Sequence, residues 1–427
     1  MNAPVYIVDG LRTPFLKSRN QPGPFAASDL ATIAGSALLA RQPFLPEQLD
    51  EVILGCASPS PDEVNIGRVV ALRMGCGRKV PGWTVMRNCA SGMQALDSAI
   101  ANIQAGRSQL VLAGGVDALS RAPLLFSDAM VRWLSAWYAA RRPGQRLGLL
   151  RRFRPAMLAP VIGIMKGLTD PVVGQLMGQT AENLAHRFGI SRDDMDAFAV
   201  RSHQRVAAAR DAGHFDGEVV PLIEDDGTLH RCDDGVRDDS TAEGLAKLKP
   251  FFDKRYGRVT AGNSSQITDG AAWLVLASEA AVKRFGLAPR ARISDSQWAG
   301  LAPEQMGLGP VHAATPILER HGLGINDLDA WEINEAFAAQ VIACLRAWAD
   351  DDYCREELGL DVAMGRLDES RLNVDGGAIA QGHPVGASGA RIVLHLLQVL
   401  ERTGGRRGIA AICIGGGQGG AMLVERT

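Results

Sequence analysis

The sequence lacks several features that would each assign it to a particular class of protein. Its 45 Lys and Arg residues are balanced by 47 Asp and Glu residues, so the net charge of −2 gives no reason to expect nucleic-acid binding. It contains no run of the roughly 18 apolar residues that a transmembrane helix needs, and it does not begin with a signal peptide. We therefore expect a cytoplasmic protein whose membrane contact, if it has any, is peripheral.

Sequence signatures of metal and disulfide sites are also missing. The seven cysteines form no CxxC pair, and such a scattered, odd-numbered set is typical of reduced thiols. There is no HExxH motif, no Cys/His cluster with zinc spacing and no GxxxxGK[ST] phosphate loop, so we predict no metal site. The cysteines are Cys56, Cys76, Cys89, Cys232, Cys344, Cys354 and Cys413.

What the sequence does contain is an alternation of strand-like and helix-like segments. Short apolar runs bounded by Gly and Asp are separated by Ala- and Leu-rich stretches with helical spacing, such as 92–104 and 389–402. This pattern is typical of an α/β fold whose sheets are buried on both faces. The apolar runs are Val5–Val8, Val52–Leu54, Leu110–Ala113, Trp273–Ala277, Trp331–Ile333 and Ile409–Ile414.

A weak internal repeat indicates two homologous halves. Ala90-Ser91-Gly92 is followed by a helical stretch and then by Leu110–Gly115, and Ala387-Ser388-Gly389 is followed in the same way by Ile409–Gly416. Two matches in the same order favour duplication over coincidence, although coincidental α/β punctuation stays open at this point. The second match is between Leu49-Asp50-Glu51-Val52-Ile53 and Leu328-Asp329-Ala330-Trp331-Glu332.

The segment between the halves has an unusual charge. Residues 129–169 contain no Asp or Glu, and Met130, Leu134, Trp137 and Tyr138 are expected on one helical face. This combination is typical of an element that lies on a membrane or a partner, but a helical hairpin packed on its own domain explains it equally well. Farther on, we expect Ser191 to cap a helix and the acidic run 224–239 to be an exposed loop. The basic residues of the segment are Arg132, Arg141, Arg142, Arg146, Arg151, Arg152, Arg154 and Lys166.

Cys89 is a candidate nucleophile because it stands directly before a predicted helix. Unpaired backbone N–H groups and the positive end of the helix dipole lower the pKa of a thiol at such a position and favour the thiolate. A buried, inert cysteine is the alternative reading.

Other residues suit acid–base work or the stabilisation of negative charge. His383 is the one histidine of eight that stands in a glycine-rich turn before a predicted helix, where the following proline holds it in place. Cys413 lies beside Gly415-Gly416-Gly417, whose backbone N–H groups can approach a substrate oxygen closely. Asn334 and Glu335 follow a predicted strand and supply an amide and a carboxylate, although they also suit a plain helix start.

Together these motifs resemble the thiolase family over essentially the whole chain. The narrower match is to the β-subunits of the fatty-acid-oxidation trifunctional complexes, because of the Arg-rich segment and the extra residues 348–371. The matching motifs are Arg12-Thr13-Pro14-Phe15, Asn88-Cys89-Ala90-Ser91-Gly92, Met177-Gly178-Gln179-Thr180-Ala181-Glu182, Thr260-Ala261-Gly262-Asn263-Ser264-Ser265, Met306-Gly307-Leu308-Gly309-Pro310, Asn334-Glu335-Ala336-Phe337, Gly382-His383-Pro384 and Cys413-x-Gly415-Gly416-Gly417.

The resemblance implies a thiolase fold, with two duplicated βαβαβαββ halves in an α-β-α-β-α arrangement and an inserted loop domain. We expect the first half to span 1–120 and to be completed by 250–285, with the insert at 121–249 and the second half at 286–427.

The resemblance also implies a 3-ketoacyl-CoA thiolase of fatty acid β-oxidation, with no bound cofactor and with CoA as co-substrate. Cys89 attacks the 3-keto carbonyl, Cys413 is the acid and base, and His383 activates Cys89. The resemblance assigns one oxyanion hole to the N–H groups of Cys89 and Gly415, and another to His383 with a water held by Asn334. The CoA-contacting positions that it implies are Ser265, Met177, Met306, Phe337 and, less securely, Arg237.

Partners and alternatives follow from the same resemblance. We expect acyl-CoA and CoA as ligands, a homodimer or dimer of dimers, a hydratase/dehydrogenase α-subunit as a candidate partner, and peripheral membrane contact through 129–169. An acetyl-CoA C-acetyltransferase that forms acetoacetyl-CoA is the runner-up. A ketoacyl synthase is less favoured because Cys413 stands where such enzymes use other residues, and the intact motif set opposes a non-catalytic acyl-CoA-binding subunit.

Overall fold

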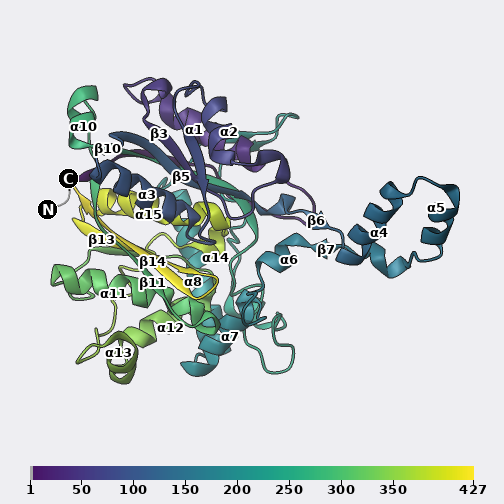
Figure 1. Ribbon diagram of the computed structural model, residues 1–427. Coiled ribbons are helices and arrows are strands. Elements are labelled where there is room, and N and C mark those ends of the chain that lie inside the picture. Colours follow the sequence, from purple (N-terminus) through teal and green to yellow (C-terminus); the bar gives the residue numbers. More distant parts are fainter. Residues whose placement is uncertain (1–2) are drawn as a thin grey trace.

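The computed structural model describes residues 3–427 and has a ten-stranded mixed sheet at its centre (Figure 1). The strand order is β4-β3-β5-β10-β1-β11-β14-β13-β12, and β2 pairs with β10 outside this path. These strands are β1 (Val5–Arg12), β2 (Leu16–Lys17), β3 (Glu51–Gly55), β4 (Gly82–Val85), β5 (Leu110–Ala118), β10 (Thr268–Ser278), β11 (Ala291–Gly300), β12 (Ala330–Ile333), β13 (Arg407–Ile414) and β14 (Gln418–Arg426).

The sheet confirms the prediction of two duplicated halves. Read outward from its middle, one side runs β1, β10, β5, β3 and the other runs β11, β14, β13, β12. On each side the outermost of these pairs, β5 with β3 and β13 with β12, is parallel and the inner pairs are antiparallel. An antiparallel pairing of β1 with β11 joins the two sides, so the halves are related by a pseudo-twofold axis.

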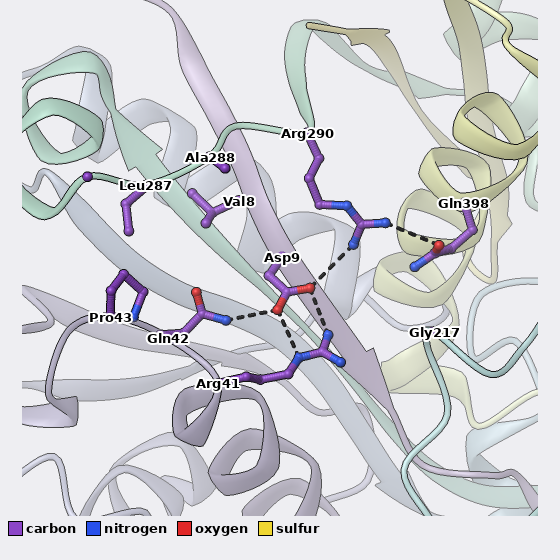
Figure 2. Close-up of a pocket in the computed structure, with 11 residues that line it drawn as sticks. Val8, Asp9, Arg41, Gln42, Pro43, Gly217, Leu287, Ala288, Arg290 and Gln398 are labelled. Carbon is purple, nitrogen blue, oxygen red and sulfur yellow. Dashed lines mark hydrogen bonds and ion pairs between the residues drawn. The ribbon is translucent and has the colours of Figure 1, made fainter.

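Small details repeat along with the strands. β1 and β11 each have a bulge before an aspartate, Asp9 and Asp295 respectively. Asp9 pairs with Arg41, from just after α1 (Ala27–Ala40), and Asp295 pairs with Arg320, near the end of α11 (Gly309–His321). Figure 2 shows the first of these clusters, where Arg41, Gln42 and Arg290 converge on Asp9. The carboxylates therefore fix the same irregularity in both halves.

The helices complete the predicted α-β-α-β-α layers. Helices α3 (Ser91–Gln104) and α15 (Val385–Thr403) form the middle layer and share one apolar core with strands of both halves. Helices α1 and α2 (Ile66–Arg73) cover the outer face of the first half, and α11 and α12 (Ala338–Trp348) cover that of the second. The remaining body helices are α7 (Met177–Arg187), α8 (Arg192–Asp211), α9 (Ala242–Ala246), α10 (Glu279–Phe285), α13 (Asp351–Leu358) and α14 (Ala378–Gln381).

Glycine allows α3 and α15 to meet backbone to backbone. A Cβ added at Gly92 would lie 2.7 Å from the carbonyl oxygen of Gly386, and one added at Gly389 would lie 2.7 Å from the amide nitrogen of Met93. Both distances are shorter than any real Cβ contact, so no other residue fits these positions without movement. The two helices consequently begin next to each other, on the pseudo-twofold axis.

The part of the chain that connects β5 to β10 includes an arm that projects from the body (Figure 1). It carries α4 (Asp128–Ala139) and α5 (Pro143–Leu150) and joins the body through the paired strands β6 (Leu124–Leu125) and β7 (Val161–Ile162), before α6 (Gly163–Gly167). Within residues 3–427, no helix is long and apolar enough to cross a membrane. The boundaries of the insert and of the two halves stay a prediction.

The face of α4 that packs differs in one residue from the predicted face. Trp133 stacks on Trp137 with ring centroids 5.3 Å apart, and its indole N–H donates to the Leu149 carbonyl at 2.9 Å. Tyr138 was expected on this face but is 82% exposed. The expectation for Tyr138 is wrong because helical spacing puts Tyr138 at one edge of the face centred on Met130, and the helix packs through the other edge, where Trp133 lies.

Two expectations for the segment after the arm have different outcomes. Ser191 caps α8 as predicted, with its hydroxyl accepting from the Asp194 amide at 3.0 Å. The expectation that the whole acidic run 224–239 is an exposed loop is wrong, because Asp233 is buried. Its carboxylate pairs with the guanidinium of Arg12 at 2.7 Å, and a fully buried arginine requires such a partner.

Replacing Gly92 by Ala tests the close approach of α3 and α15. The new methyl group has no room beside Gly386 and Ala390, so the free energy of unfolding should fall by about 1–3 kcal/mol, as is usual for overpacking. Gly148→Ala in α5, where no atom lies within 4 Å of the added Cβ, is the matched control. Urea titrations of both variants measure the effect, and equal stability of the two would contradict the packing argument.

Candidate active site

Cys89 lies in a tight turn that contacts the glycine loop after β13. Asn88 has a left-handed φ of 44°, and its side-chain amide donates to the Gly415 carbonyl at 2.8 Å. The Ser91 hydroxyl donates to the Asn88 carbonyl at 2.7 Å and accepts from the Arg87 amide at 2.9 Å. These bonds hold the thiol of Cys89 at the start of α3, where the Gly415 backbone hydrogen-bonds to it.

The predicted lowering of the pKa of Cys89 is wrong. Burial of the thiol raises its pKa, and the negative charge of Asp117 adds to the rise. The hydrogen bonds from the backbone of Gly415 and of Cys89 itself favour the thiolate but do not outweigh the loss of water. Cys89 is therefore a neutral thiol at pH 7, and a base must take its proton before it can act as a nucleophile.

His383 is held as a neutral imidazole, the state in which a histidine can accept a proton. Its Nδ1 lies 2.6 Å from the Ser388 hydroxyl, which donates its one hydrogen to the Pro384 carbonyl at 3.1 Å. Nδ1 must then carry the imidazole hydrogen, and Nε2 keeps a lone pair with no partner within residues 3–427. Burial, together with the positive charge of Arg391, lowers the pKa of His383 to about 4, so the ring is neutral at pH 7.

Asn334 and Cys413 stand at neighbouring strand ends. β12 and β13 pair in parallel, and the Asn334 amide nitrogen donates to the Ala411 carbonyl at 2.9 Å. The side-chain oxygen and nitrogen of Asn334 are buried and have no partner within the described chain. Buried polar groups are nearly always hydrogen-bonded, so this amide points to a polar ligand or water. Burial raises the pKa of Cys413 well above its usual range, and the nearness of a second ionisable thiol, Cys89, raises it further.

Glu335 positions the segment that leads to His383. Its carboxylate accepts from the Ser202 hydroxyl at 2.6 Å, from the Asn373 side chain at 2.9 Å and from the Ile379 amide at 3.2 Å. Ile379 lies in α14, directly before Gly382 and His383. The roles of Ser202, Asn373 and Ser388 were missed in the sequence because none of their neighbours marks them as different from ordinary helix or loop residues.

The predicted CoA-contacting residues are only partly brought together. The sulfur of Met177, at the start of α7, would lie 3.0 Å from a Cβ at Gly415. Ser265 donates its amide to the Ala336 carbonyl at 2.9 Å, next to Phe337, and Met306 is 3% exposed in the same apolar core as Phe337. Arg237 is exposed, and its backbone bonds to His203 and Ser240 rather than to any of these residues.

Two further features lie apart from this site. The cavity in Figure 2 is lined by residues such as Asp9, Arg41 and Arg290 and by none of the predicted site residues. No group of three or more His, Cys, Asp or Glu side chains within residues 3–427 is arranged to hold a metal ion.

The low pKa of His383 predicts an acid-dependent loss of stability. Between pH 6.5 and about 4 the unfolded histidine binds a proton that native His383 does not, so the free energy of unfolding falls as the pH falls through this window. Going from pH 7 to pH 5 should cost the wild type about 2 kcal/mol more than His383→Gln, which cannot titrate. Urea titrations at both pH values measure this, and equal losses would show that His383 is not buried in the neutral form.

The chain is similar to known proteins along its whole length. The sequence model described as "Thiolase, N-terminal domain" matches residues 5–280, and that described as "Thiolase, C-terminal domain" matches residues 287–426. A β-ketoadipyl-CoA thiolase of Pseudomonas aeruginosa is 42% identical, with 100% of both chains covered. A 3-ketoacyl-CoA thiolase of Yersinia enterocolitica is 40% identical over 99% of this chain and 96% of its own.

A solved structure is similar in the same way. Human mitochondrial 3-ketoacyl-CoA thiolase, in complex with CoA, is 37% identical, covers 100% of this chain and 98% of its own, and has a TM-score of 0.85. With its duplicated halves, its pair of cysteines and its buried histidine at the junction of α3 and α15, this chain belongs to the thiolase family.

Proposed function

We propose that this chain cleaves a 3-ketoacyl-CoA between C2 and C3, with CoA as the second substrate, and releases acetyl-CoA and a shortened acyl-CoA. The observation that carries the proposal is the meeting of two neutral thiols, Cys89 and Cys413, where the helix after Cys89 and the helix after His383 touch backbone to backbone. The names of the three relatives given above support it, because each is named a thiolase. Breaking a carbon–carbon bond beside a thioester requires a covalent acceptor, an acid and a base.

In the first half-reaction, Nε2 of His383 takes the proton of Cys89. The thiolate attacks the C3 carbonyl carbon, the C2–C3 bond breaks, and its electron pair leaves with the acetyl-CoA enolate. The acyl chain stays on Cys89 as a thioester. Cys413 then gives its proton to C2, which its high pKa allows because it is fully protonated at pH 7.

In the second half-reaction, the Cys413 thiolate takes the proton of an incoming CoA thiol. The CoA thiolate attacks the carbonyl carbon of acyl-Cys89, and the shortened acyl-CoA leaves. The Cys89 thiolate recovers its proton from His383, so both cysteines and the histidine return to their starting state.

Two groups of donors stabilise the negative oxygens that form on the way. The backbone N–H groups of Cys89, just before α3, and of Gly415, which reaches Cys89 from the loop after β13, serve the oxygen on C3. Protonated His383 and a water held by the Asn334 amide serve the enolate oxygen of the departing thioester. Loss of one such donor typically costs on the order of 3 kcal/mol of transition-state stabilisation.

We propose that CoA is held by the side chains near the glycine loop. Met177 beside Gly415, and Ser265 and Phe337 beside each other, suit the pantetheine arm, with Met306 packed beneath them. Arg237 is exposed near Lys17 and suits the nucleotide phosphates by charge alone.

Cys89→Ala tests whether Cys89 is the nucleophile. Thiolysis should be lost by at least three orders of magnitude in the variant, because no other group forms the thioester. The rate is followed by loss of the 3-ketoacyl-CoA absorbance, with a urea titration as the control for folding. Full activity of Cys89→Ala would rule the mechanism out.

The same assay distinguishes the substrates and the rival functions. The series runs from acetoacetyl-CoA to 3-ketohexadecanoyl-CoA and includes β-ketoadipyl-CoA, whose acyl chain ends in a free carboxylate. Activity restricted to acetoacetyl-CoA and its synthesis would favour the acetyl-CoA C-acetyltransferase. Acyl-CoA binding without cleavage anywhere in the series would favour the non-catalytic subunit.

We also propose that the arm, residues 124–167, makes a contact outside this chain. Val131, Tyr138 and Leu147 are about half exposed or more, and the basic residues of 129–169 have no acidic residue among them. The candidates are an anionic membrane surface or a hydratase/dehydrogenase α-subunit.

A homodimer or dimer of dimers is proposed as well, since β4 is an edge strand with half-buried residues, the type of strand that can pair with a second copy.

Vesicle binding separates these candidates for the arm. If the arm lies on a membrane, co-sedimentation with vesicles rich in anionic lipid should fall by several-fold when Arg141, Arg142, Arg151 and Arg152 become Ser. Salt should weaken the wild-type binding. No co-sedimentation at low salt, or binding that neither salt nor the substitutions change, would favour a protein partner.

A further inference from the structure

Asp117 is a buried carboxylate that the reaction described above does not use. It lies near the end of β5 and is 0% exposed. One oxygen accepts from the Ser58 amide at 2.9 Å and from the Cys56 thiol at 3.3 Å. The other accepts from the Ala57 amide at 3.3 Å and from the Gly386 amide at 2.5 Å. With donors on all sides, the carboxylate is suited to remain ionised although burial raises its pKa to about 6.

The contact with Gly386 crosses from one half of the molecule to the other. Gly386 lies in the first turn of α15, where it corresponds in the repeat to Cys89 at the start of α3. At the start of α3, Gly415 reaches across from the end of β13 in the second half. At the start of α15, Asp117 reaches across from the end of β5 in the first half. The pseudo-twofold axis thus puts equivalent strand ends against equivalent helix starts.

Asp117 holds the turn that carries His383. Gly386 comes three residues after His383, so a fixed Gly386 amide limits how far the imidazole can move. The carboxylate also binds the loop after β3, through the Cys56 thiol. This loop lies against the start of α15, because a Cβ added at Gly386 would be 3.1 Å from the Cα of Cys56. Without Asp117, the Gly386 amide would lose its partner in a buried place.

The same carboxylate acts electrostatically on the nucleophile. Its negative charge opposes the ionisation of Cys89. Cys56 after β3 is a neutral thiol whose pKa is raised by burial and by the charges of Asp117 and Glu63. His383 before α15 and Cys413 on β13 are also neutral at pH 7. Burial is the main cause of the raised pKa of Cys89, and the charge of Asp117 adds to it.

We propose that Asp117 is a positioning residue for the reaction: its bond to the Gly386 amide holds the His383 turn against the Cys89 turn, and its carboxylate is a fixed negative charge between the two halves. The catalytic part of this inference rests on the proposed function. The electrostatic part does not, because it concerns the resting enzyme.

The test measures alkylation of Cys89 and thiolysis in the same variants. Asp117→Asn removes the negative charge and replaces one carboxylate oxygen by an NH2 group. This group is a donor and would face a backbone N–H that is also a donor. In this variant, alkylation of the Cys89 peptide by iodoacetamide, followed by mass spectrometry, should have its midpoint at a lower pH than in the wild type. Thiolysis should lose about tenfold in kcat with KM within about twofold, because His383 is misplaced while CoA contacts remain.

Asp117→Glu separates charge from position and covers the case in which Asp117→Asn does not fold. It keeps the charge but moves the oxygens, so the alkylation midpoint should stay at the wild-type pH while kcat falls. Asp50→Asn is the matched control at the other end of β5, where an exposed carboxylate accepts from the Gln109 amide at 2.6 Å and the Leu110 amide at 2.9 Å. It should change neither reading.

Each outcome decides one part of the inference. An unchanged alkylation midpoint in Asp117→Asn would overturn the electrostatic part, and unchanged kcat in both Asp117 variants would overturn the positioning part. If the wild type has no thiolysis activity but the midpoint still shifts, the proposed function fails and the charge effect stands.

Discussion

The site depends on the backbone contact between α3 and α15. Gly92 and Gly389 let each helix approach the other without intervening side chains, so both helices begin at the pseudo-twofold axis. Cys89 precedes one helix and His383 precedes the other, and the end of β13 brings Cys413 to the same place. A larger residue at either glycine would separate the helix starts and with them the groups that must exchange protons.

Burial sets the proton states at this junction. It raises the pKa values of both thiols and lowers that of His383, so at pH 7 the resting site holds two neutral thiols beside a neutral imidazole. At rest, such a site holds no thiolate that could be oxidised. Cys89 ionises only when the base takes its proton. The helix dipole contributes, but it is weaker here than the loss of water around the thiol.

Much of the architecture could be predicted from the sequence because local patterns report it. Alternating apolar runs marked the strands, and the two Ala-Ser-Gly turns marked the duplication that the sheet order confirms. The motifs around Cys89 and His383 located the helix starts. The pKa of Cys89, the burial of Asp233 beside Arg12 and the role of Asp117 could not be predicted, because each depends on contacts between segments far apart in the chain. The exposure of Tyr138 could not be predicted either, because Tyr138 lies at the edge of the apolar face of α4 and only tertiary contacts decide which edge packs.

The most direct test of the account is to find the acyl group. Cys413→Ala enzyme is mixed with a 3-ketoacyl-CoA, quenched in acid and digested, and the peptides are weighed by mass spectrometry. The account predicts that the acyl group accumulates on the Cys89 peptide, because CoA is no longer deprotonated to remove it. An acyl group on another residue, or no covalent adduct while cleavage proceeds, would contradict the central role of the thiol at the start of α3.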